Sequence, residues 1–218
     1  MKIVLIFLFY NVLFNNIILS QNNEAEKESL KYIIYGAFTL PQGDFKATSG
    51  DKAGNSKNGF GASIDISKYY NEKTYFTSSV SFSKNAVDIT ALEKYFGRNR
   101  VTVGDYSTTW GLTGIKLTEE VKSNFTIYGI GQIGILYSIF PDIEIRVPKI
   151  TQTTIPVFAF GFGIGAGVKI NNINLGIKYL SSEPEYEQRT TFENSCATTK
   201  VKLPVSLLVI QIGFDLHK

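Results

Sequence analysis

Very few side chains in this sequence could support catalysis or metal binding. The chain has one histidine, His217, and one cysteine, Cys196. A serine hydrolase needs a histidine beside its nucleophile, and a zinc site needs several histidine or cysteine ligands. With one residue of each kind, and with His217 as the penultimate residue, neither chemistry is expected. We therefore predict no catalytic residue, no metal site and no cofactor.

Two other patterns resemble sites only superficially. Five carboxylates in two loop-like segments could gather around a weak calcium ion, namely Asp142, Glu144, Glu183, Glu185 and Glu187. A solvated acidic surface explains them more simply. The alternating glycines of 161–167 look like a phosphate-binding loop, but no helix follows them. Cys196 has no partner for an internal disulfide, so an unpaired thiol is expected.

Composition narrows the class of protein further. The 218 residues carry a formal net charge of +3, too mild a balance to indicate a nucleic-acid partner. Mean hydropathy is +0.02, low for a helical membrane protein. After the first 20 residues, no apolar run reaches the roughly 18 residues of a membrane-spanning helix.

The N-terminal segment has the pattern of an export signal. Lys2 supplies the positive start, and residues 3–9 and 12–14 supply an apolar stretch. We predict a signal peptide over 1–20, a flexible polar lead-in over 21–29, and one barrel domain over 30–218. The mature chain would then lie outside the cytoplasm.

The clearest structural signal is the segment 157–170, VFAFGFGIGAGVKI. Its even positions are all apolar, and its odd interior positions are alanine, glycine or lysine. A period of two predicts a strand with one apolar face and one small or polar face. Its length exceeds the roughly 9–11 residues that a tilted strand needs to cross a bilayer. Similar segments predict eight strands in all, over 30–38, 60–67, 76–83, 108–117, 124–139, 157–170, 173–180 and 205–216.

The connections between these segments alternate in length. Those after the second, fourth and sixth strands are short, and those after the odd-numbered strands are roughly 15–25 residues long, as in barrels inserted from the short-turn side. An even number of strands also closes without an exposed edge, which lipid requires. The predicted fold is therefore all-β, an eight-stranded antiparallel up-and-down transmembrane β-barrel, with residues 92–96 forming one helical turn in a loop.

The alternation also assigns side chains to the two faces of the wall. The residues predicted to face lipid are Phe60, Ile64, Ile66, Phe76, Val80, Phe82, Phe158, Phe160, Phe162, Ile164, Leu175, Ile177, Ile210, Ile212 and Phe214. The polar residues predicted to face the lumen are Asp65, Gln132, Lys169, Asn174, Lys178, Gln211 and Asp215. Trp110, Tyr137 and Tyr179 are predicted in an aromatic girdle near the long loops. The glycines of 161–167 are expected to leave room for longer side chains opposite.

Two short motifs are similar to those of a known protein family. The segment Pro41-Gln42-Gly43-Asp44-Phe45-Lys46 and the segment Asn58-Gly59-Phe60-Gly61 resemble the porin-like outer-membrane β-barrel domain family of bacteria. The resemblance implies a small eight-stranded barrel with periplasmic termini and external loops, and it carries over no catalytic residue. Many such barrels end in phenylalanine, whereas here Asp215-Leu216-His217-Lys218 follows Phe214.

These observations predict a non-enzymatic integral protein of the bacterial outer membrane, reached by signal-peptide export. Its partners would be membrane lipid and an unidentified extracellular partner, and four long external loops would give it a structural or surface-interaction role. One alternative is a narrow, porin-like passive channel, although eight strands leave an interior that side chains can fill. The other is a soluble, lipocalin-like carrier, whose apolar face would point inward around an apolar ligand.

Overall fold

The computed structural model describes residues 30–50, 52–97, 101–145, 149–192 and 195–216. The predicted signal peptide, the predicted lead-in and His217 lie outside these ranges.

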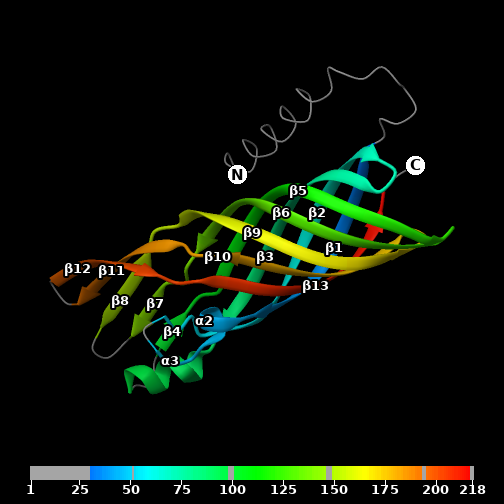
Figure 1. Cartoon of the computed structure of the whole chain (residues 1–218). Helices are drawn as coiled ribbons and strands as arrows, with labels where there is room; N and C mark the ends of the chain where they lie inside the picture. The colour runs from blue at the N-terminus through cyan, green and yellow to red at the C-terminus, as the bar shows by residue number, and fades with distance from the viewer. Residues whose placement is uncertain (1–29, 51, 98–100, 146–148, 193–194, 217–218) are drawn as a thin grey trace.

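Eight strands form a closed antiparallel barrel (Figure 1). They are β1 (Lys31–Pro41), β2 (Ser56–Asn71), β3 (Thr74–Val87), β5 (Tyr106–Lys122), β6 (Phe125–Ile139), β9 (Val157–Ile170), β10 (Ile173–Ser182) and β13 (Val205–Asp215). Each strand pairs with its neighbour along the chain, and β1 closes the barrel against β13. The predicted eight-stranded up-and-down barrel is confirmed, and β9 has the predicted bounds.

Short turns lie at one end of the barrel, which we call the turn-side end. They join β2 to β3, β5 to β6 and β9 to β10. In the last of them Asn171 has φ +52°, a left-handed conformation that asparagine adopts more readily than most residues. All the long connections lie at the opposite, loop-side end. β5 is longer than predicted, because the charged residues from Thr118 to Lys122 extend the strand instead of forming a turn.

The long connections were predicted as loops, and this was wrong. Three of the four contribute strands to a second sheet with the order β12-β11-β8-β7-β4, which extends beyond the loop-side end (Figure 1). Its strands are β4 (Val101–Val103), β7 (Ile143–Ile145), β8 (Ile150–Thr154), β11 (Glu185–Phe192) and β12 (Ser195–Lys202). The strands β4 and β7 have only three residues each, and β8, β11 and β12 are rich in threonine or charged residues, so their sequences carry little strand signal. Pairing with neighbours that are distant in the sequence makes them strands.

Two helices complete the loop-side end. In the first motif, β1 ends at Pro41, and Gly43 begins α2 (Gly43–Lys46) with φ +54°, which glycine adopts without strain. The helical turn predicted at 92–96 lies within a longer helix, α3 (Ile89–Phe96). The Asp88 side chain accepts a hydrogen bond from the Ala91 N–H and so caps its start, while Gly97 ends it in the left-handed conformation.

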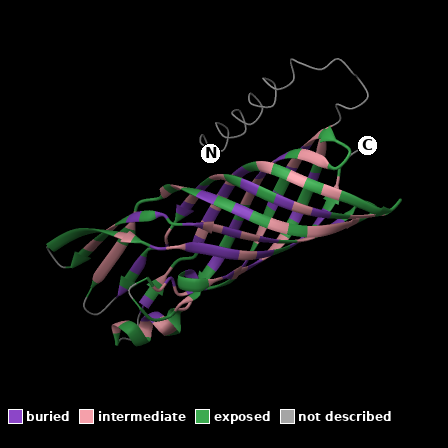
Figure 2. Ribbon diagram, viewed as in Figure 1, coloured by how far each residue is buried: buried purple, intermediate pink, exposed green. Residues whose placement is uncertain are grey.

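Buried and exposed residues alternate along the barrel strands (Figure 2). The phenylalanines of β9 point outward, with exposed fractions of 49% at Phe158, 69% at Phe160 and 43% at Phe162. The placement of Trp110 in an outer girdle was wrong, because it points into the barrel and is 0% exposed. Leu112, two residues further along β5, also points inward.

The hydrophobic core fills the loop-side half of the lumen. Its largest buried side chains from the barrel wall include Trp110, Leu136, Leu180 and Leu207. The sequence was interpreted as giving a polar lumen, and that interpretation was wrong for this half. Apolar residues here lie on both faces of the wall, so alternation alone did not distinguish inside from outside.

A chain of aromatic rings links this core to the loops. Phe45 of α2 packs on Tyr106 at 4.8 Å between ring centroids, Tyr106 on Phe140 at 5.0 Å, and Phe140 on Tyr186 of β11 at 5.4 Å. The Tyr186 hydroxyl donates a hydrogen bond to Ser138 Oγ at 2.7 Å. Burial raises the pKa of Tyr186, so this hydroxyl stays protonated at neutral pH. The second sheet is thereby anchored to the barrel.

Candidate functional site

The outer surface of the barrel carries a belt of apolar side chains. All fifteen residues predicted to face lipid point outward, and most are exposed, from 38% at Phe76 to 73% at Phe60. Ile66 and Val80 are half-buried by their neighbours. The belt has further members that were not among the residues predicted to face lipid, including Tyr32, Ile34, Ile115, Leu117, Ile133 and Ile135. On β5 the sequence does not alternate clearly between apolar and polar residues, because the inward positions are apolar as well.

The polar residues predicted for the lumen all point inward. Asp65, Gln132, Asn174, Lys178 and Gln211 are buried, with exposed fractions of 0–6%. They occupy the half of the lumen nearer the turns. Lys178 Nζ lies 3.7 Å from Asp65 Oδ2.

The other two predicted lumen residues form an ion pair nearer the turn-side opening. Lys169 Nζ donates to Asp215 Oδ2 at 2.5 Å. Lys169 is half-buried, and its charged pair faces the water-accessible part of the lumen described next.

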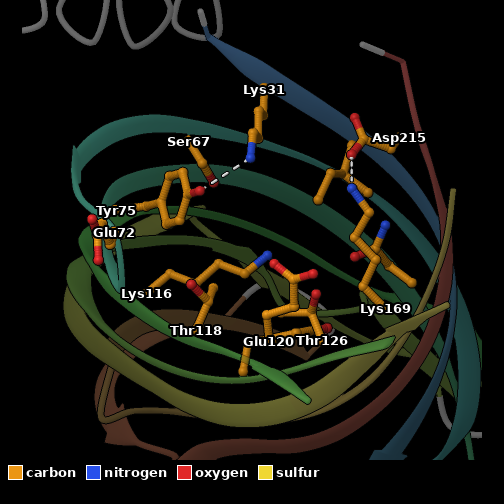
Figure 3. Close-up of a pocket in the computed structure, with 13 residues that line it drawn as sticks. Lys31, Ser67, Glu72, Tyr75, Lys116, Thr118, Glu120, Thr126, Lys169 and Asp215 are labelled. Carbon is orange, nitrogen blue, oxygen red and sulfur yellow. Dashed lines mark hydrogen bonds and ion pairs between the residues drawn. The ribbon is translucent and has the colours of Figure 1, made fainter. Parts of the chain in front are cut away.

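A cavity of about 180 Å³ opens at the turn-side end, and we call it the vestibule (Figure 3). Lys31, Lys116 and Lys169 reach into it from β1, β5 and β9. Lys31 Nζ donates to the Tyr75 hydroxyl at 3.1 Å, and Lys116 Nζ lies 4.2 Å from the centroid of the Tyr128 ring. The arrangement is a charged recess that opens at the turn-side end and ends inside the barrel.

The glycines of β9 leave room for large lumen side chains. A Cβ atom on Gly161 would lie 2.7 Å from the Trp110 ring, and one on Gly167 would overlap the Tyr128 hydroxyl. The expectation that these glycines accommodate longer side chains opposite is confirmed. Their role is packing.

A larger pocket, of about 410 Å³, lies at the loop-side end between α3, residues 48–50 and 52–55, and the second sheet. Apolar side chains from both layers line it, among them Phe96 and Phe140. Lys52 is the one charged residue among the described residues that line it.

The second sheet gives this pocket an amphipathic wall. On the strands β7, β8 and β11, the register places Ile143, Gln152 and Thr190 on one face, toward the pocket. The opposite face is polar and carries Glu144, Thr151, Thr153, Glu185, Glu187, Arg189, Thr191, Thr198, Lys200 and Lys202. The pocket is the part of the apolar layer that the loops leave unfilled.

The loop carboxylates that could have gathered around a calcium ion do not form a ligand set in the described part of the chain. Glu185 pairs with Lys200 at 3.3 Å, and Asp142 Oδ1 accepts a hydrogen bond from the Thr154 N–H. Among the residues that the structure describes, no group of histidine, cysteine, aspartate or glutamate could hold a metal ion. Cys196 is an exposed free thiol on β12 that accepts a hydrogen bond from Arg189 Nε at 2.9 Å.

The described part of the chain contains no helix that is both long and apolar enough to span a membrane.

Comparisons with known proteins identify the fold. No protein-family model matches the chain, and no curated protein matches it. Among solved structures, it is similar to the outer membrane protein OprG from Pseudomonas aeruginosa, with a TM-score of 0.52 and 10% identity over 88% of this chain and 98% of that one. It is also similar to the outer membrane protein AlkL, with a TM-score of 0.51 and 12% identity over 90% and 95% of the two chains.

A major outer membrane protein from Thermus thermophilus gives a TM-score of 0.50 at 8% identity, over 86% of this chain and 100% of that one. At these identities the likeness establishes the fold. The chain has the closed eight-stranded barrel fold of small bacterial outer-membrane proteins.

Proposed function

We propose that this chain is a non-enzymatic integral protein of the bacterial outer membrane, with a barrel closed to solutes and a ligand-binding surface at its loop-side end. The apolar belt is the observation that carries the proposal. Isolated apolar residues are common on soluble proteins, but a continuous belt of apolar side chains around all sides of a barrel is unfavourable in water.

The height of the belt fits a bilayer. From Phe158 to Ile170, β9 covers roughly 40 Å along the strand, or roughly 30 Å along the barrel axis at a tilt of about 40°. Outer-membrane barrels carry an apolar band about 25 Å tall. The similarity to OprG and AlkL, both outer membrane proteins, supports the same location.

The two alternatives fit the geometry less well. A carrier of the lipocalin type needs its apolar face around an internal cavity, whereas here Phe158, Phe160 and Phe162 point outward. A passive channel needs an open lumen, whereas Trp110 and Leu136, both 0% exposed, fill the loop-side half. We infer that the vestibule does not continue through the barrel to the loop-side end.

The loop-side pocket gives the surface role a specific form. Its volume of about 410 Å³ falls within the roughly 300–1,000 Å³ of small-ligand sites, which are lined mostly by apolar groups with a few polar ones. Phe96 and Ile145 would contact an apolar body, while Gln152 and Gln188 would orient a polar end. Lys52 at the same pocket favours a ligand whose polar end is anionic.

Membrane placement is tested by expressing the full chain in a Gram-negative host and washing its envelope with alkaline carbonate. We expect the protein to stay with the outer-membrane fraction and to partition into detergent. Recovery of a soluble periplasmic protein would refute the proposal. Purified protein in planar bilayers should show no sustained conductance, and steady ion current would refute the closed lumen.

Ligand binding is tested by titrating sodium decanoate into protein held in lipid nanodiscs, with calorimetric detection and empty nanodiscs as reference. Gln152→Trp should fill the pocket and abolish binding. Thr151→Trp, one residue away on the opposite face of β8, is the matched control and should bind normally. Equal binding by the two variants would contradict the assigned pocket.

A further inference from the structure

A third, much smaller cavity lies inside the barrel, between the apolar core and the polar half of the lumen. It measures about 20 Å³, which is room for one water-sized particle. Trp110, Leu180 and Leu207 line it on the loop side. Ser63 and Lys178 line it on the polar side.

Three of the residues that line it carry a buried donor atom for which the described residues provide no acceptor. Trp110 Nε1, Lys178 Nζ and Ser63 Oγ are buried and have no hydrogen-bond partner among the described residues. The indole and the ammonium can act only as donors. Leaving such groups unsatisfied in an apolar interior is costly, so three donors on residues that line one cavity call for an acceptor there.

Two other hydroxyls in the wall already have hydrogen-bond partners. The Thr39 hydroxyl accepts from Asn85 Nδ2 at 3.0 Å, and Ser83 Oγ lies 2.7 Å from Thr108 Oγ1. A water molecule accepts two hydrogen bonds and must donate two of its own. A monatomic anion accepts from all three donors and needs no acceptor in return.

The charge balance around the cavity also favours an anion. Lys178 is 3.7 Å from Asp65, longer than the roughly 2.7–2.9 Å of a charge-assisted hydrogen bond. Asp65 is also the carboxylate that attracts Lys116. The pairing of β5, β6, β9 and β10 places Lys116 and Lys178 on one continuous rung of the wall, on its inner face.

Other carboxylates near the turn-side end do not offset the second lysine. Asp215 pairs with Lys169, and Glu72 and Glu120 are exposed at the mouth of the vestibule. Asp65 thus serves two lysines in the inner part of the described lumen. One further negative charge beside Lys178 would restore balance where screening by water is weak.

We propose that this inner cavity binds one monatomic anion of the chloride type, held by the Lys178 ammonium, the Trp110 indole N–H and the Ser63 hydroxyl. The volume excludes phosphate and carboxylates. Once bound, the anion links Trp110 of the apolar core to Lys178 and Ser63 in the polar half of the lumen.

The experiment uses Trp110, the only tryptophan in the chain, as the reporter. Bromide is titrated against nanodisc-held protein at constant ionic strength, with excitation selective for tryptophan and with caesium as the cationic control. Because Trp110 is 0% exposed, collisional quenching should be absent. We expect saturable quenching by bromide and none by caesium. Quenching that is absent, or that rises linearly without saturation, would overturn the proposal.

Ser63→Ala removes one donor with little loss of volume and should weaken bromide binding about fivefold to tenfold, the value of one hydrogen bond. Ser67→Ala, four residues nearer the turns on the same strand and outside the cavity lining, is the matched control and should bind as the wild type does. Equal constants for the two variants would contradict the site. Crystals grown in bromide should show an anomalous peak between Lys178 and Trp110, and a water molecule there without anomalous signal would overturn the assignment.

Discussion

Replacing Ile164 with arginine tests the apolar belt most directly. Ile164 lies near the middle of β9, points outward and is 56% exposed. Counted from Val157, its position lies roughly 23 Å along the strand and roughly 17 Å along the barrel axis, close to the middle of the belt. Arginine at the midplane of a bilayer-spanning barrel costs about 2–4 kcal/mol.

That free-energy change corresponds to a roughly 30-fold to 700-fold loss in the folding equilibrium constant. The assay is urea-induced unfolding and refolding of the barrel in lipid vesicles, followed by the difference in gel mobility between folded and unfolded protein. Thr153→Arg is the control, since Thr153 is exposed on the polar face of the second sheet. If Ile164→Arg cost no more than Thr153→Arg, the belt would not lie in hydrocarbon.

Three further substitutions examine the interior. Trp110→Ala should cost about 3–5 kcal/mol, because it removes the largest fully buried side chain of the core, and denaturant titration would measure the loss. Gly161→Leu should cost about 1–3 kcal/mol of stability and shift the tryptophan emission, because its Cβ would lie 2.7 Å from the Trp110 ring. Ala166→Leu, on the outer face of the same strand, is the control and should change neither the stability nor the emission. Lys169→Gln should cost less than about 1 kcal/mol, because its ion pair with Asp215 lies beside the water-accessible vestibule; a larger loss would mean that the pair is effectively buried.

The barrel could be predicted because each of its strands must satisfy two environments at once. On β9, phenylalanine and isoleucine on one side and glycine and lysine on the other leave a single consistent interpretation, and β9 has the predicted bounds. On β5 the same method placed Trp110 on the outer face. Inside the loop-side half the lumen is as apolar as the outer belt, so polarity no longer distinguishes the faces.

The candidate sites were less accessible to sequence reasoning. Lys178 and Asp65 could be assigned to the lumen by alternation, but their separation and their shared cavity depend on strands 113 residues apart in the sequence. The loop-side pocket depends on β8 and β11, whose polar sequences resemble loops. Register across the second sheet, which no single strand encodes, places Gln152 and Thr190 on one wall.

The sequence by itself determined the period of two, the number of barrel strands and the alternation of short and long connections, because each of these is a local property of the chain. Only the tertiary structure decided what fills the lumen, how the long connections pair into a second sheet, and which residues with buried donors line one cavity. Those outcomes depend on which strands become neighbours when the barrel closes. Closure brings together residues that are far apart in the chain, and the local sequence around each of them does not specify the contact.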